Sequence, residues 1–188
     1  MARNEERRVA LADAGIKVLA REGARGLTHR AVDSVAGTPR GTASNYFPTR
    51  DELVAALVER IGQRLTPDPA LGPGAPERPA DRELFADYLR DVVRRLSADR
   101  DVALALFELR LEAARRPAIA EALTRWRQAA FEEDVAFNAE AGLPGDRPEI
   151  ALFHYAIDGM MLDHLTAPLD TGMSINTAID EFVRRILG

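Results

Sequence analysis

Apolar residues recur at helical spacing along most of the chain. In the first segment Val9, Ala12, Ile16 and Leu19 lie three or four positions apart, and the pattern stops before Gly23. This spacing predicts an amphipathic helix over about residues 4–22. Similar patterns predict further helices over about residues 49–65, 85–96, 102–111, 117–141 and 174–187, with one more beginning near Pro148.

Two short helices are predicted between the first two long ones. Thr28 suits an N-cap, and Leu27 can pack on Val32 as a hydrophobic staple, so that a helix should cover about residues 28–36. Gly37 provides a tight turn after it.

A third helix should follow directly. Thr38 can cap it, Pro39 suits its first position, and the helix can run through Tyr46 before Pro48 interrupts it. The sequence Thr49-Arg50-Asp51-Glu52 then matches a capping box and opens the next helix.

The pattern divides the chain into a small head and a larger body. We expect residues 1–48 to form a three-helix head, and residues 49–188 to form a helical body. Residues 66–80 hold five prolines and two glycines, which predicts a mobile loop inside the body. No period-two pattern indicates a strand, and the predicted fold class is all-α.

Composition excludes several kinds of site. The chain has no cysteine, which excludes disulfides and thiolate metal sites. It has only three histidines, which leaves few metal ligands. His154 and Asp158 lie at i and i+4, a weak indication of a metal site, and we expect neither a metal nor another cofactor. No apolar stretch reaches the roughly 18 residues of a membrane span, and the first residues lack an apolar signal core, so we expect a cytoplasmic protein without a membrane partner.

The charge is unevenly distributed. The formal net charge is −5, but residues 1–50 carry nine Lys or Arg against five acids, and the remaining residues carry 16 against 25. A basic head on an acidic body is typical of a DNA-binding module attached to another domain. The two short helices and their glycine turn fit a helix-turn-helix, although such hairpins also occur inside all-α cores.

The run from Gly23 to Leu53 resembles the N-terminal signature of the TetR family of bacterial repressors. Matching features are a threonine that opens the second helix, Ala-Gly in the turn, a glycine before the recognition residues, an aromatic-Phe pair, and a basic residue followed by an acid. They are Thr28, Ala36-Gly37, Gly41, Tyr46-Phe47 and Arg50-Asp51. Two positions depart from the pattern: Ser44 stands where many members have tyrosine, and Thr38-Pro39 replaces the usual Val-Ser.

The resemblance implies a double-stranded DNA partner with a palindromic operator. By reach and polarity, Thr28 and the amides behind it suit a phosphate, and His29, Tyr46 and Arg50 can also hold the DNA backbone. Gly41 would allow close approach, or would only pack. The candidates for contact with base edges are Arg40, Thr42, Ser44 and Asn45, with Arg30 able to serve either purpose.

For the body, the resemblance implies a small-molecule pocket and a homodimer interface. A pocket would use aromatic and apolar side chains of the central helices, with Glu108 as a polar anchor; the alternative for each is core packing. The candidates are Phe85, Tyr88, Phe107, Glu108, Leu111, Trp126 and Phe153. The last two helices are the expected dimer interface, because the helix near Tyr155 is apolar on nearly all sides; in a monomer the same pattern would mean a central core helix.

The expected function is a transcriptional regulator, a repressor that an unknown effector releases from its operator. Two alternatives have no DNA-binding role: an all-α interaction protein whose helical hairpin packs internally, and a small enzyme. No catalytic constellation accompanies the pattern, so we expect no enzyme.

Overall fold

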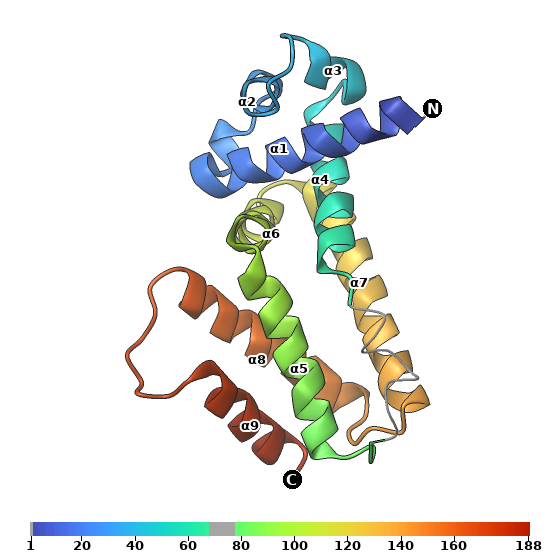
Figure 1. Ribbon diagram of the computed structural model, residues 1–188, viewed down its shortest axis with the longest axis vertical. Coiled ribbons are helices and arrows are strands. Elements are labelled where there is room, and N and C mark those ends of the chain that lie inside the picture. The colour runs from blue at the N-terminus through green and yellow to red at the C-terminus, as the bar shows by residue number, and fades with distance from the viewer. Residues whose placement is uncertain (1, 68–77) are drawn as a thin grey trace. The chain divides into compact units, whose positions relative to one another are not determined.

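The computed structural model describes residues 2–67 and 78–188, with side chains from residue 4 onward, and these residues form only helices and connecting segments (Figure 1). In chain order the helices are α1 (Ala2–Gly26), α2 (His29–Val35), α3 (Thr42–Tyr46), α4 (Arg50–Leu65), α5 (Arg82–Ala98), α6 (Arg100–Ala113), α7 (Pro117–Glu140), α8 (Arg147–Leu165) and α9 (Ile175–Ile186). The all-α prediction is confirmed. The predicted loop at 66–80 falls largely outside the described residues.

Two compact units divide these helices. One consists of Met1–Thr66 and Asp99–Arg127, and the other of Pro67–Ala98 and Gln128–Gly188. The first therefore holds α1 to α4, α6 and the first part of α7, and the second holds α5, the rest of α7, α8 and α9. The division of function between residues 48 and 49 stays a prediction.

The first unit is built around the apolar face of α1. α1 packs against α2, α4 and α6, and fully buried side chains from these helices form one core, among them Leu11, Ile16, Leu57, Ile61 and Leu109. Phe47, which follows α3, is 0% exposed and anchors the end of that short helix in the same core. The core thus fixes α2 and α3 on α1.

Helix α1 is longer than predicted and is broken near its end. It reaches Gly26, but Gly23 has φ 68° and ψ −176°, outside the helical region. The predicted stop at Gly23 is therefore the site of the break, and one further helical segment follows it.

The capping predictions hold at two helix starts. Thr28 accepts a hydrogen bond from the Ala31 N–H at 3.1 Å, and Thr49 and Glu52 form both hydrogen bonds of a capping box. The predicted start of the third helix at Thr38-Pro39 was wrong, because α3 begins only at Thr42. A residue outside α3 caps that helix instead.

The second unit packs α5 against α8 and α9. Its buried side chains include Phe85, Phe153, Ile157, Met161 and Ile179. None of the helices in the described part of the chain combines the length and the apolar character that a bilayer crossing needs.

Candidate nucleic-acid interface

A buried aspartate on α2 holds the start of α3. Asp33 is 3% exposed, and its two carboxylate oxygens accept hydrogen bonds from the backbone N–H groups of Gly41 at 2.8 Å and Ala43 at 2.7 Å. The Thr38 hydroxyl also donates to it, at 3.3 Å. Because Gly41 at the N-cap position has no side chain, Asp33 supplies from another helix the cap that α3 lacks.

Glycine makes the connection between α2 and α3 possible. Gly37 has φ 64° and Gly41 has φ 89°, in the left-handed region where other residues are strained. The connection therefore turns sharply, and α3 lies beside α2 in the upper part of Figure 1. α2, the turn and α3 form a helix-turn-helix.

The side chains predicted to contact bases line α3 and the turn before it. Arg40, Ser44 and Asn45 are exposed, Thr42 is half-buried, and Arg30 is exposed on α2. The Thr42 hydroxyl donates to the Pro39 carbonyl at 2.6 Å, and the Ser44 hydroxyl donates to the Gly41 carbonyl at 3.0 Å. The structure thus brings these candidates together.

Several candidates for the DNA backbone instead form contacts within the head. His29 is half-buried, and its Nε2 lies 2.6 Å from the Phe47 carbonyl oxygen. Since a carbonyl only accepts, Nε2 carries the hydrogen in this bond. Arg50 donates from Nη2 to the Ala24 carbonyl at 2.6 Å and from Nη1 to the Leu27 carbonyl. His29 and Arg50 therefore join helices, whereas Thr28 is exposed at the start of α2.

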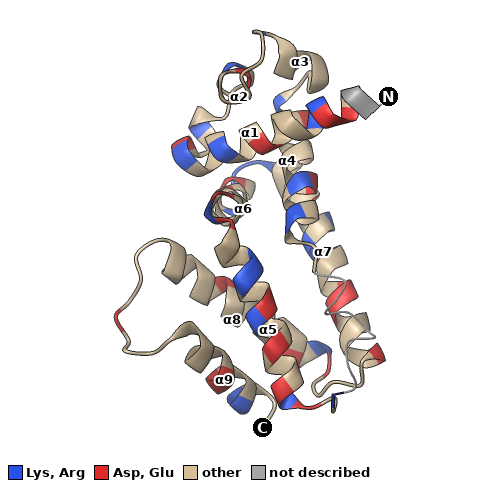
Figure 2. Ribbon diagram, in the orientation of Figure 1, with Lys and Arg blue, Asp and Glu red and all other residues tan. Residues whose placement is uncertain are grey.

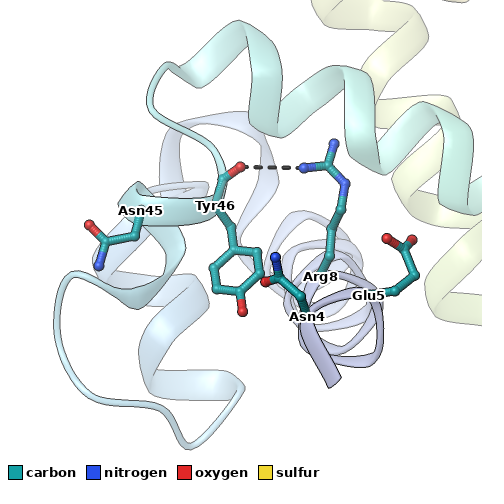
Figure 3. Close-up of a pocket in the computed structure, with 5 residues that line it drawn as sticks. All are labelled: Asn4, Glu5, Arg8, Asn45 and Tyr46. Carbon is teal, nitrogen blue, oxygen red and sulfur yellow. Dashed lines mark hydrogen bonds between the residues drawn. The ribbon is translucent and has the colours of Figure 1, made fainter. Parts of the chain in front are cut away.

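Arg8 on α1 contacts the residues at the end of α3. Its guanidinium lies 4.7 Å from the centre of the Phe47 ring and donates to the Tyr46 carbonyl at 3.3 Å. Arg8, Asn4 and Glu5 line a small polar hollow with Asn45 and Tyr46 (Figure 3). The Tyr46 ring is turned toward Asn4, and the Asn45 side chain points away from α1. Tyr46 is thus placed by α1 as well as by α3.

Sequence reasoning missed Asp33 and Arg8. An acid on a short helix is usually a solvated surface residue, and nothing in the spacing of Asp33 distinguishes it. Arg8 contributed only to the count of basic residues. Figure 2 shows Lys and Arg positions at both ends of α1, and only the three-dimensional contacts separate Arg8 from the others.

The predicted pocket residues fall into both units. In the first, Phe107 is buried, Trp126 is half-buried, and Leu111 is 59% exposed. Glu108, expected as a polar anchor for a ligand, accepts a hydrogen bond from the Ala24 N–H at 2.9 Å, beside the break in α1. The geometry gives Glu108 a contact between α6 and α1.

In the second unit the structure brings two of the candidates together. The rings of Phe85 and Phe153 lie 4.7 Å apart between centres, and both are buried. Tyr88 packs edge-on against Phe137, which was not among the candidates, at 4.9 Å. α5, α7 and α8 therefore contribute aromatic side chains to this unit.

The weak indication of a metal site at His154 has another structural account. His154 Nε2 lies 3.0 Å from Asp134 Oδ2, and its ring packs edge-on against Phe131. In the part of the chain that the structure describes, no group of three or more His, Asp or Glu residues could hold a metal ion.

The helix-turn-helix and its anchoring contacts place the chain in the class of helix-turn-helix proteins. A family model for the C-terminal domain of tetracyclin repressor-like proteins matches residues 80–188, more than half of the chain. The chain therefore belongs to the TetR family of transcriptional regulators.

Solved structures agree with this assignment. A TetR-family member from Streptomyces coelicolor A3 is 28% identical with a TM-score of 0.72, covering 97% of this chain and 99% of that one. A putative TetR-family regulator from Rhodococcus sp. has the same fold at 22% identity and a TM-score of 0.78, covering 97% and 100%. The multidrug binding protein EbrR, solved with imidazole, is 26% identical with a TM-score of 0.66, covering 97% and 95%. No curated protein sequence matches the chain.

Proposed function

We propose that this regulator is a cytoplasmic repressor that binds a palindromic operator as a homodimer and is released by a small-molecule effector. The observation that carries the proposal is the α3 helix, which Asp33 holds in place while Arg40, Ser44 and Asn45 remain exposed. The proposal includes no catalytic step, no metal and no cofactor.

The geometry of α3 supports major-groove binding. A short helix with exposed serine and asparagine, preceded by an exposed arginine in the turn, can present donors and acceptors to base edges, arginine suiting guanine and asparagine suiting adenine. Thr28 at the start of α2 and Tyr46 at the end of α3 suit the DNA backbone. His29 and Arg50 act mainly by holding this surface in position, because their donors already contact carbonyls of the head.

A direct experiment tests DNA binding. Fluorescence anisotropy should detect binding to the DNA upstream of the protein's own gene, with affinity that falls as salt rises. The double substitution Arg40→Ala with Asn45→Ala should abolish preference for this DNA over random duplex. The matched control is Arg125→Ala with Gln128→Ala, which removes exposed side chains of α7. Equal affinity of the wild type for both DNAs at every salt concentration would contradict the proposal.

An exposed apolar stripe on α8 supports the homodimer. Leu152, Tyr155 and Leu162 are 49%, 70% and 42% exposed, and Gly159, between them, has open space where a Cβ would lie. These positions fall on one face of the helix, because they are spaced by three or four residues. A second copy of α8 is the occupant we propose, since a small residue within an apolar stripe lets two helices approach closely.

The oligomeric state tests this interface. Sedimentation of the wild type should show a dimer, and Leu152→Glu with Tyr155→Glu should give a folded monomer with weaker operator binding. Val35→Glu changes an exposed apolar residue of α2 and should leave the dimer intact. A wild-type monomer at the concentrations at which operator is bound would exclude a preformed dimer.

The effector is the third part of the proposal. The aromatic side chains of α5, α7 and α8 around Phe85 and Phe153 suit a molecule with several aromatic rings. The structure of EbrR has been solved with malachite green bound, and that protein is 25% identical to this chain with a TM-score of 0.68. Malachite green is therefore a reasonable first probe.

Effector release requires coupling between ligand and operator. Allosteric coupling is typically about 1–3 kcal/mol, which corresponds to roughly 5- to 150-fold in affinity. A bound probe should therefore raise the melting temperature of the DNA-free protein and weaken operator binding within that range. Tight binding of the probe without any change in operator affinity would count against this part of the proposal.

A further inference from the structure

The start of α3 has its hydrogen-bond donors engaged within the protein. The N–H groups of Gly41 and Ala43 donate to Asp33, and the Thr42 N–H donates to the Pro39 carbonyl at 3.1 Å. Three consecutive amides, at positions 41–43, are therefore satisfied in residues that the structure describes completely.

The two hydroxyls of the same turn are engaged in the same way. Thr42 donates to the Pro39 carbonyl and Ser44 donates to the Gly41 carbonyl. A hydroxyl has one hydrogen and two lone pairs, and a carbonyl oxygen has no hydrogen to give, so each hydroxyl must be the donor in its bond. What remains for a DNA partner is the acceptor capacity of each hydroxyl oxygen.

We propose that Thr42 and Ser44 form an acceptor surface that selects a base with an amino group, adenine or cytosine, at defined positions of one DNA strand in the major groove. Only the N6 amino group of adenine and the N4 amino group of cytosine are donors there, whereas guanine offers acceptors and thymine an acceptor and a methyl group. The inference rests on the proposed function and specifies which bases these two residues read. Ser44 carries most of the selection because it is exposed, and Thr42 is half-buried.

Asp33 is the positioning residue for this surface. Its carboxylate fills the place of the N-cap and satisfies the amides that would otherwise attract phosphate oxygens. The turn is thereby directed toward base edges, and contact with guanine is left to the exposed guanidinium of Arg40.

Selection from a pool of random DNA duplexes tests the inference. Sequences are enriched separately with the purified wild type and with the variants Ser44→Ala and Thr42→Val. The control variant is Thr124→Val, which removes an exposed hydroxyl on α7. Ser44→Ala and Thr42→Val should each lose a preference for adenine or cytosine at one position of the half-site, and Thr124→Val should lose none. Loss of a preference for guanine or thymine, or no loss at all, would overturn the inference.

Modified bases give the decisive measurement. Deoxynebularine lacks the amino group of adenine, and deoxyzebularine lacks that of cytosine. The analogue is placed at the position whose preference Ser44→Ala loses. There it should weaken wild-type binding about two- to tenfold, as expected for one hydrogen bond, and should leave the binding of Ser44→Ala unchanged. Equal wild-type affinity for the parent and analogue duplexes would overturn the inference. Failure of the wild type to enrich any sequence would instead contradict the proposed function itself.

Discussion

The carboxylate of Glu108 on α6 accepts a hydrogen bond of 2.9 Å from the backbone N–H of Ala24, beside the break in α1. The backbone carbonyl of Ala24 accepts a second hydrogen bond, of 2.6 Å, from the Arg50 side chain on α4. Both backbone groups of Ala24 are therefore held by charged side chains from other helices. This arrangement fixes the end of α1, from which the chain continues into the helix-turn-helix.

Removal of Glu108 should destabilise the protein in the absence of any ligand. Glu108→Ala leaves the Ala24 N–H without its acceptor, and we expect the free energy of unfolding to fall by about 1–2 kcal/mol, measured by urea denaturation. Glu112→Ala is the control, because it removes an acid of the same helix that forms an i,i+4 pair with Arg116. Its effect should be smaller than that of Glu108→Ala, because no backbone N–H loses its acceptor. Equal effects would assign Glu108 no special structural role.

Replacement of Asp33 should separate specific from non-specific DNA binding. Asp33→Asn keeps the size of the side chain, but its nitrogen cannot accept, so one N–H at the start of α3 loses its partner. We expect a loss of about 1–3 kcal/mol in stability and a larger loss of affinity for the selected operator than for random duplex. Asp51→Asn makes the same charge change on an exposed residue of α4 and should weaken neither selectively. Parallel losses on both DNAs would contradict a positioning role.

Arg40 should account for one guanine contact. If its guanidinium binds a guanine with two hydrogen bonds, Arg40→Ala should weaken operator binding by about 1–3 kcal/mol and relax the preference at a single base pair. Quantitative binding to all single-base variants of the selected site would show this pattern. A uniform loss across all variants, matching that on random DNA, would instead make Arg40 a phosphate contact.

Acid should weaken one ion pair between α7 and α8. Arg147 donates to Glu132 at 2.5 and 2.7 Å, and this contact, with a smaller one from Gln128, lowers the pKa of Glu132 from 4.5 to about 2. Because the folded-state pKa is the lower one, the contribution to stability is complete above pH 4.5 and is lost as the pH falls to about 2.

The variant Glu132→Gln checks that sign. Its stability should lie below that of the wild type at neutral pH, and the difference should shrink as the pH falls through the same window. Unfolding curves measured at a series of pH values give the difference, and Glu133→Gln, an exposed neighbour, is the control. A difference that grew on acidification would contradict the assigned direction.

Local signals in the sequence were sufficient for most of the fold. The capping box at Thr49 and Glu52 and the N-cap at Thr28 depend on residues three positions apart, so the sequence itself contains both partners. The all-α class and the position of nearly every helix followed from apolar spacing in the same way.

Contacts between distant residues were not predictable from such patterns. The start of α3 was placed too early because Thr38 and Pro39 look like a local cap, whereas the real cap is Asp33 on the preceding helix. Glu108 and Arg50 were expected to meet a ligand and a phosphate, yet they contact backbone groups 84 and 23 or more residues away. Residue type indicated that Glu108 would accept and Arg50 would donate hydrogen bonds, but not which groups they would contact.

The engaged donors at the start of α3 also bear on the thermodynamics of recognition. Since Asp33, Thr42 and Ser44 already order the turn in the free protein, the conformational entropy of fixing it is lost during folding and not during DNA binding. The head would meet DNA as a preorganised surface, so calorimetry should find little ordering entropy from this turn, and association should proceed without a slow folding step.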